Sequence, residues 1–175
     1  ICEGYSDWCL LIVGPHEDFY KEELLQKFSG STALKIYDFS TIKNLSYIPN
    51  VVFTGPVFGS EKYDIYRNSN LFILPSDFEN FGLTIAEALS TGLPVIVSIN
   101  SPWEEIINNN CGWQIEQKIN SIKATLSISL SKNIDELKKM GMGGKGLTQK
   151  YRPSSVASQS IELYNRIINK FNNSI

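Results

Sequence analysis

The sequence contains little cysteine, little histidine and no long apolar run. Its three cysteines, Cys2, Cys9 and Cys111, cannot all pair with one another and match no zinc-ligand spacing, so we expect reduced thiols and no metal site. No apolar run approaches the ~18–20 residues that span a bilayer, and no signal peptide is recognisable, which predicts a cytoplasmic protein. The net charge of −2 gives no electrostatic reason to expect a nucleic acid or an anionic membrane as partner.

The residues that are present suit one globular domain of the α/β class. With 175 residues, 42% of them hydrophobic and 19% charged, the chain can bury a sizeable core. Short apolar runs bounded by Gly, Pro or Asn predict strands, which alternate with stretches of helical periodicity. This alternation predicts a Rossmann-like, doubly wound parallel sheet. Strands are expected at 8–13, 34–37, 51–54, 71–74, 95–97 and 113–115, and helices at 18–28, 61–68, 83–89 and 119–130.

Capping signals define further helix starts. Ser60 is expected to cap the helix at 61–68, and Ser101 to open a short helix in a capping box with Glu104. Asn133 opens another helix, and Ser154 or Ser155 caps a last one that ends near Phe171. The glycine-rich stretch at 141–148 lacks the order of a phosphate-binding loop and follows a helix, so it is interpreted as a glycine-weakened helix.

The stretch 71–100 carries the strongest functional signal. It is predicted to form strand, loop, helix and strand, with the loop at the carboxyl end of a strand and the start of a helix, where open α/β sheets bind ligands. The N–H groups of Gly82, Leu83 and Thr84 carry the positive end of the helix dipole, which suits a diphosphate. Glu79 and Glu87 frame this loop and suit a hydroxyl-rich sugar, although acidic residues near a helix start are also common without any ligand.

Several motifs together resemble one family. The segment E-N-F-G-L-T-I-A-E at 79–87 resembles the E-x7-E signature of family-4 glycosyltransferases of the two-Rossmann-domain GT-B architecture. The resemblance covers nearly the whole chain and is specific for the C-terminal half, which binds the nucleotide-sugar. Bacterial surface-polysaccharide enzymes are the most similar members. The other matching segments are WCLLIVGP at 8–15, VFTGPV at 52–57, LPS at 74–76, EALSTGLPVI at 87–96, SPWEEI at 101–106 and CGW at 111–113.

The resemblance implies a role for each site residue. Glu87 would accept hydrogen bonds from the ribose hydroxyls, and Glu79, the implied catalytic residue, would hold hydroxyls of the transferred hexose. Thr84 and the helix end would face the phosphates. The backbone of Asn80, Phe81, Gly82 and Leu83 would contribute N–H groups, and Val52, Gly55 and Pro56 would line the base.

The resemblance also implies a reaction and its partners. A hexose would pass from a UDP- or GDP-sugar to a glycan or lipid-linked acceptor, with retention of anomeric configuration, no cofactor and no obligatory metal. Such domains begin with a strand and a basic loop, neither of which is recognisable here, so 1–175 is expected to be the donor-binding part of a larger enzyme, inactive alone. The helix at 154–171 would cross back to an N-terminal acceptor domain. We expect a role in lipopolysaccharide, capsule or exopolysaccharide synthesis at the inner membrane face, with membrane contact only through that other domain.

Three alternatives remain to be weighed. A sugar-nucleotide epimerase of the same architecture would carry the same donor site. A non-catalytic Rossmann-like module would lack turnover, although no G-x-G-x-x-G follows any strand, which disfavours a dinucleotide. A glycosidase carboxylate pair is disfavoured because a helix start between the two carboxylates favours phosphate over water. The single histidine, His16, is interpreted as a loop residue without a chemical role.

Overall fold

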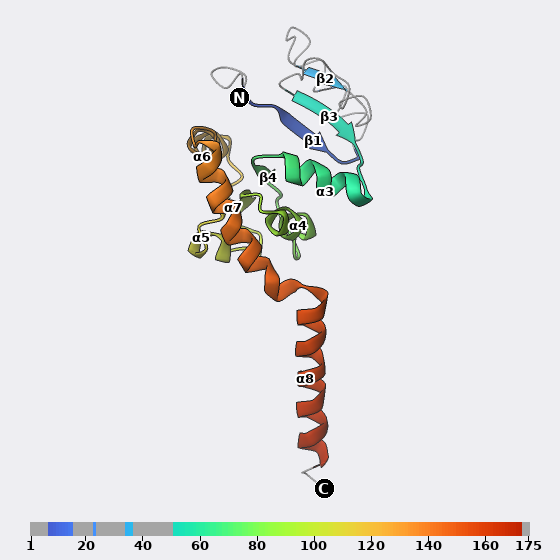
Figure 1. Ribbon diagram of the computed structural model, residues 1–175. Helices are drawn as coiled ribbons and strands as arrows, with labels where there is room; N and C mark the ends of the chain where they lie inside the picture. Colours follow the sequence, from blue (N-terminus) through green and yellow to red (C-terminus); the bar gives the residue numbers. More distant parts are fainter. Residues whose placement is uncertain (1–6, 16–22, 24–33, 37–50, 173–175) are drawn as a thin grey trace. The chain divides into compact units, whose positions relative to one another are not determined.

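The computed structural model describes residues 7–15, 23, 34–36 and 51–172, which Figure 1 draws in colour. The chain divides into two compact units, Ile1–Lys62 and Tyr63–Ile175, and each is described by itself. The expected helix at 18–28, apart from the single residue 23, and His16 lie outside the described residues.

The first unit contains a three-stranded parallel sheet. Its strands are β1 (Leu10–Val13), β2 (Leu34–Ile36) and β3 (Val51–Gly55), in the order β1-β3-β2. Leu10 and Leu34 both lie opposite Val51, so β3 is central, and its middle residues are buried. The sequence predicts all three strands to within two residues, and β1 and β3 are short apolar runs ended by a turn residue.

A helix follows the first sheet and continues into the second unit. Helix α3 (Gly59–Asn68) starts earlier than predicted, so Ser60 lies inside its first turn and the predicted cap is wrong. The helix begins at Gly59, whose φ of 61° is a left-handed value that suits glycine because glycine has no side chain. In this helix Tyr66 is buried, while Tyr63 and Ile65 are half-buried.

The second unit is built around another parallel sheet. Its strands are β4 (Phe72–Leu74), β5 (Val95–Ser98) and β6 (Gly112–Ile115), in the order β4-β5-β6, and the helices α4 (Leu83–Thr91) and α5 (Glu105–Asn108) lie between them in the chain. This alternation of strands and helices confirms the predicted α/β class with parallel pairing. The central strand β5 is fully buried, whereas β4 at the edge is half-buried.

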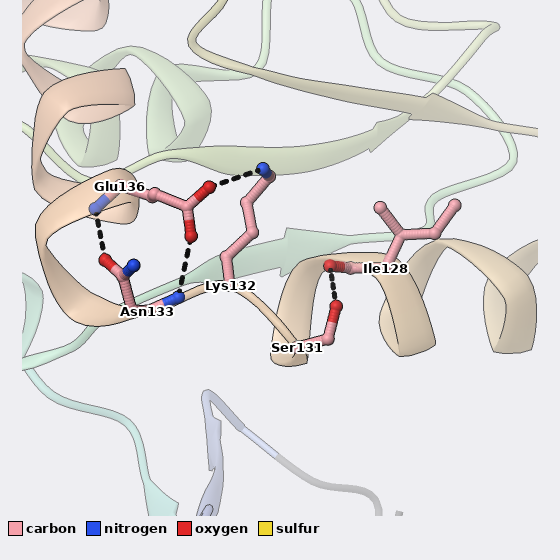
Figure 2. A network of polar contacts seen from close by, with 5 residues as sticks. All are labelled: Ile128, Ser131, Lys132, Asn133 and Glu136. Carbon is pink, nitrogen blue, oxygen red and sulfur yellow. Dashed lines mark hydrogen bonds and ion pairs between the residues drawn. The ribbon is translucent and has the colours of Figure 1, made fainter.

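Helices complete the second unit. They are α6 (Ile119–Leu130), α7 (Ile134–Thr148), the short 3-10 turn η1 (Gln149–Tyr151) and α8 (Pro153–Asn172). The Asn133 side chain accepts a hydrogen bond from the Glu136 N–H, and the Glu136 carboxylate accepts one from the Asn133 N–H, as Figure 2 shows. This confirms the predicted cap, and Lys132 adds an ion pair to Glu136 at 3.3 Å.

The predicted capping box at Ser101 is wrong. Helix α5 begins only at Glu105, and Ser101 is buried with its hydroxyl donating to the carbonyl oxygen of Ser98 at 2.8 Å. In this segment the side chain of Trp103 packs into the core, with only 1% of its surface exposed. Burial of a large aromatic side chain therefore outweighs the local capping signal.

The glycine-rich stretch forms the C-terminal half of α7, in agreement with the predicted helix, and packs closely against α4. A side chain at Gly141 would overlap the carbonyl oxygen of Gly92, and one at Gly144 would lie 2.7 Å from Leu89 Cδ2. Gly92 ends α4 with a φ of 89°, and its N–H donates to the Leu89 carbonyl. We call Gly92, Gly141 and Gly144 the glycine seam, because α7 packs closely against the end of α4 at these residues.

None of the residues of α8 is buried, in contrast to the other α-helices that the structure describes. The helix begins at Pro153, before the predicted serine cap. No helix in the part of the chain that the structure describes combines the length and the apolar character required to cross a membrane.

Candidate functional site

The loop between β4 and α4 forms the centre of the candidate site. The Ser76 hydroxyl donates to Glu79 Oε1 at 2.7 Å, which orients this half-buried carboxylate within the loop. Gly82, with φ 72° and ψ 62°, precedes the helix, and its carbonyl accepts the N–H groups of Ile85 and Ala86 at 2.9 and 3.1 Å. No side chain caps this helix start. The backbone N–H groups that precede Ile85 therefore indicate a candidate binding site for an anionic ligand.

Only glycine suits position 82. Its φ is left-handed, and an added Cβ would lie 2.7 Å from Ile85 Cδ1 and 3.3 Å from Trp103 Nε1. The glycine therefore lets the loop turn tightly into α4 while its backbone stays packed against the core.

Three aromatic side chains support the loop from one side. The rings of Phe81, Trp103 and Tyr151 contact one another with centroid distances of 5.4, 5.2 and 5.4 Å, and we call them the aromatic triad. The Trp103 indole N–H donates to the Phe81 carbonyl oxygen at 2.5 Å. The contacts of Trp103 and Tyr151 with the loop were not predictable from the sequence, since both residues lie far from the loop in the chain and no local pattern links them to it.

Polar contacts keep Tyr151, the third residue of the aromatic triad, in position. The Tyr151 hydroxyl donates to Glu105 Oε2 at 3.4 Å, and Lys150 forms an ion pair with the same carboxylate. The hydrogen bond to Glu105 is the main cause that raises the pKa of Lys150. Turn η1 is therefore fixed to α5, and with it the ring that contacts Phe81.

The second predicted carboxylate, Glu87, has a different neighbour. Its Oε2 accepts a hydrogen bond from the Tyr66 hydroxyl at 3.3 Å, which links α4 to α3. Burial, followed by the negative charge of Glu87, raises the pKa of Tyr66 well above its ordinary value, so Tyr66 remains a hydrogen-bond donor. A carboxylate has about four acceptor positions, so the Tyr66 bond is compatible with a hydroxyl ligand.

Asn100 joins the loops at the carboxyl edge of the sheet. Its amide nitrogen lies 3.1 Å from the Asp77 carbonyl oxygen, in the loop after β4, and 3.5 Å from Gln117 Oε1, after β6. Its backbone N–H donates to Ser98 Oγ at the end of β5. The segments that follow all three strands therefore meet at one edge, as expected for a parallel sheet.

The predicted site residues fall into two groups, one in each unit of the chain. Glu79, Phe81, Gly82 and Glu87 have the contacts described above, and Asn80, Leu83 and Thr84 are exposed at the same loop and helix start. Val52, Gly55 and Pro56 belong to the first unit, so they are described separately. There, the side chain of Val52 is fully buried, Pro56 is exposed, and Gly55 has a φ of 68° while its carbonyl accepts the Gly14 N–H.

A cavity of about 460 Å³ lies elsewhere in the second unit, and none of the predicted site residues lines it. It is lined by Gly92 and Pro94 before β5, by Asn70 before β4, and by Lys138 and Lys145 of α7. The C-terminal ends of α3 and α4 lie at this cavity, and the negative ends of their helix dipoles favour cationic side chains there. The dipoles therefore account for the presence of Lys138 and Lys145, and no anionic ligand is needed to explain them. In the described ranges, no three His, Cys, Asp or Glu side chains gather as metal ligands would.

Comparison with known proteins identifies the family of the chain. Residues 1–146 match the family described as glycosyl transferases group 1. Mannosylfructose-phosphate synthase of Agrobacterium fabrum is 41% identical over 59 residues, which are 34% of this chain and 13% of that protein. The chain spans only 12% to 35% of the length of the first curated relatives that it matches.

Solved structures show the same fold. Sucrose-phosphate synthase of Thermosynechococcus elongatus superposes with a TM-score of 0.70 at 21% identity, covering 92% of this chain and 39% of that one. The C-terminal domain of the glycosyl transferase group 1 protein LpcC from Francisella tularensis gives a TM-score of 0.60 at 25% identity, covering 86% and 73%. The parallel α/β fold matches GT-B glycosyltransferases and resembles their C-terminal domain. The chain belongs to the glycosyl transferases group 1 family.

Proposed function

We propose that this chain binds the nucleotide-sugar donor of a retaining glycosyltransferase that transfers a hexose from a UDP- or GDP-sugar. The observation that carries the proposal is the start of α4, where the N–H groups before Ile85 have no side-chain cap and lie between Glu79 and Glu87. A diphosphate fits the helix start, and hydroxyl groups fit the two carboxylates.

Each group has a part in the transfer. The bond between the anomeric carbon and the diphosphate oxygen breaks, and the acceptor hydroxyl oxygen forms the new bond to that carbon while its proton passes to the departing diphosphate oxygen. The leaving diphosphate carries away the bonding electrons, and the N–H groups at Gly82, Leu83 and Thr84 stabilise its growing charge. Glu79, held by Ser76, binds hexose hydroxyls and orients the anomeric carbon, so it acts as the catalytic residue of this proposal.

The remaining parts of the donor are assigned by the family resemblance. Glu87, oriented by Tyr66, accepts bonds from the ribose hydroxyls. The proposal requires no metal, because backbone N–H groups at the helix start supply the positive charge. A glycan or lipid-linked acceptor would bind through a second domain against which α8 packs, during polysaccharide synthesis at the cytoplasmic face of the membrane.

The first experiment measures thermal stabilisation of the full-length protein by UDP, GDP and ADP. A nucleotide at ~100 times its dissociation constant should stabilise the fold by ~2.7 kcal/mol. Glu87→Gln should weaken binding of the preferred nucleotide about tenfold, because a charge-assisted hydrogen bond is lost while the shape and the Tyr66 contact remain. Glu162→Gln on exposed α8 is the matched control and should leave binding unchanged.

A second variant separates the two carboxylates. Glu79→Gln should leave the affinity for the plain nucleotide unchanged and lower the affinity for the nucleotide-sugar, because only the latter carries the hexose. A folded protein that none of the three nucleotides stabilises would contradict the proposal and favour a non-catalytic module. Turnover of the nucleotide-sugar without any acceptor would instead indicate an epimerase.

A further inference from the structure

The indole of Trp103 fixes the direction of one backbone group in the candidate site. Its Nε1–H donates to the Phe81 carbonyl oxygen at 2.5 Å, across 22 positions of the sequence. The Trp103 side chain is only 1% exposed, so water does not compete for this bond. The orientation of the Phe81 carbonyl is thus set by a core residue outside the loop.

The same contact also orients the N–H of Gly82. The Phe81 carbonyl and the Gly82 N–H belong to one planar trans peptide unit, in which the two groups point in opposite directions. A carbonyl held toward Trp103 therefore turns the Gly82 N–H away from the core. A hydrogen bond to the carbonyl also polarises the peptide and makes its N–H a stronger donor.

The rest of the aromatic triad keeps the indole in place. The Tyr151 ring contacts both Trp103 and Phe81, and its hydroxyl donates to Glu105 on α5. The Gly82 backbone closes the remaining side, since a Cβ there would lie 3.3 Å from the indole nitrogen. The indole thus has neighbours from η1 and from the loop itself, and rotation would break several contacts together.

We propose that Trp103 is a positioning residue, which turns the Gly82 N–H toward the diphosphate of the donor. This inference rests on the proposed donor-binding function and adds a residue to it. Trp103 touches no reacting atom in this arrangement. It acts through the peptide unit between Phe81 and Gly82, and Tyr151 keeps the indole in its place.

The test uses Trp103→Phe in the full-length protein, which keeps an aromatic ring in the core and removes the N–H donor. We expect the affinity for the preferred nucleoside diphosphate to fall about tenfold, while the affinity for the corresponding nucleoside stays unchanged. Both are measured by calorimetry well below the melting temperature. Trp113→Phe on β6 is the matched control, since it makes the same substitution outside the loop and the aromatic triad, and its diphosphate affinity should match the wild type.

A spectroscopic measurement covers the case in which Trp103→Phe fails to fold. The Trp103 indole N–H resonance of the wild-type protein, assigned with selective labelling, should shift when the diphosphate is added and stay in place with the nucleoside. An unmoved resonance, or a folded Trp103→Phe protein with wild-type diphosphate affinity, would overturn the inference and leave the proposed function intact. A wild-type protein that binds no nucleotide would overturn both.

Discussion

Cys111 illustrates how burial sets the chemistry of a single side chain. The residue is fully buried after α5, and its thiol donates to the Ile106 carbonyl oxygen at 3.6 Å. Burial raises the pKa of Cys111 to about 11. At neutral pH the thiol is therefore protonated as well as shielded, and only the thiolate reacts readily.

This predicts that Cys111 reacts with iodoacetamide at pH 8 only when the fold opens. In a protein with Cys2→Ser and Cys9→Ser, the rate of alkylation should be at least ~100-fold below that of the urea-unfolded protein, because opening is rare in a stable domain. Mass spectrometry over time measures it. Alkylation of the folded protein at the unfolded rate would show that the thiol is neither buried nor protonated.

At the residue scale, the site residues within one local motif could be predicted from the sequence. The residues that the fold places against this motif from distant segments could not. Glu79, Gly82 and Glu87 stand out because a strand, a loop and a helix start follow each other in the chain. Trp103 and Tyr151 contact the same loop from later segments, and Tyr66 reaches Glu87 from α3. No spacing rule predicts such contacts, because they depend on how the helices pack.

At the scale of elements, the glycine seam explains a composition that otherwise disfavours a helix. Glycine inside a helix costs about 1 kcal/mol relative to alanine, and α7 carries four of them. Gly141 and Gly144 lie against α4, where any side chain would collide with it. Close packing of the two backbones offsets the low helix propensity.

Two substitutions in the same helix should therefore have opposite effects. Gly141→Ala should lower the free energy of unfolding by about 1–3 kcal/mol, because its methyl group would overlap the Gly92 carbonyl. Gly146→Ala should raise it by about 0.5–1 kcal/mol, since that position has open space and alanine favours the helix. Urea unfolding of both variants measures the difference. Equal effects of the two substitutions on the free energy of unfolding would contradict close packing at the glycine seam.

Some elements were predictable in full and others only in part. The bounds of α6 match the expected 119–130, because its periodic apolar residues run up to clear polar boundaries. The cap at Asn133 was predictable because both of its hydrogen bonds are local. The signal at Ser101 is equally local, but burial of Trp103 overrides it, and such competition between local and long-range interactions cannot be weighed from the sequence alone.

At the scale of the whole molecule, α8 is the α-helix without a buried residue in the part of the chain that the structure describes. Its apolar side chains lie on the exposed surface of a 20-residue helix. Packing of the helix at 154–171 against another domain stays a prediction. The exposed apolar residues are Val156, Ile161, Leu163, Tyr164, Ile167, Ile168 and Phe171.

Removal of α8 should leave the stability of this chain nearly unchanged. A chain that ends after Arg152 should melt close to the temperature of the 175-residue chain, with a difference in unfolding free energy below about 1 kcal/mol, because no residue of α8 is buried. A chain that ends after Met140 is the control and should be strongly destabilised, since it also loses Gly144 and Leu147 from the core. Equal melting of both shortened chains would contradict this assignment.

The glycine seam also bears on how the protein exchanges hydrogen with water. Glycine-rich segments usually open easily, and their amide protons are replaced by deuterium within a short time. Here the middle of α7 lies directly on the end of α4, and Gly141 and Gly144 are both buried. Opening this part of α7 requires separation of two helices and exposure of Leu89 and Leu147. The stretch richest in glycine is therefore among the last to exchange, while α8, with a conventional helical sequence, exchanges early.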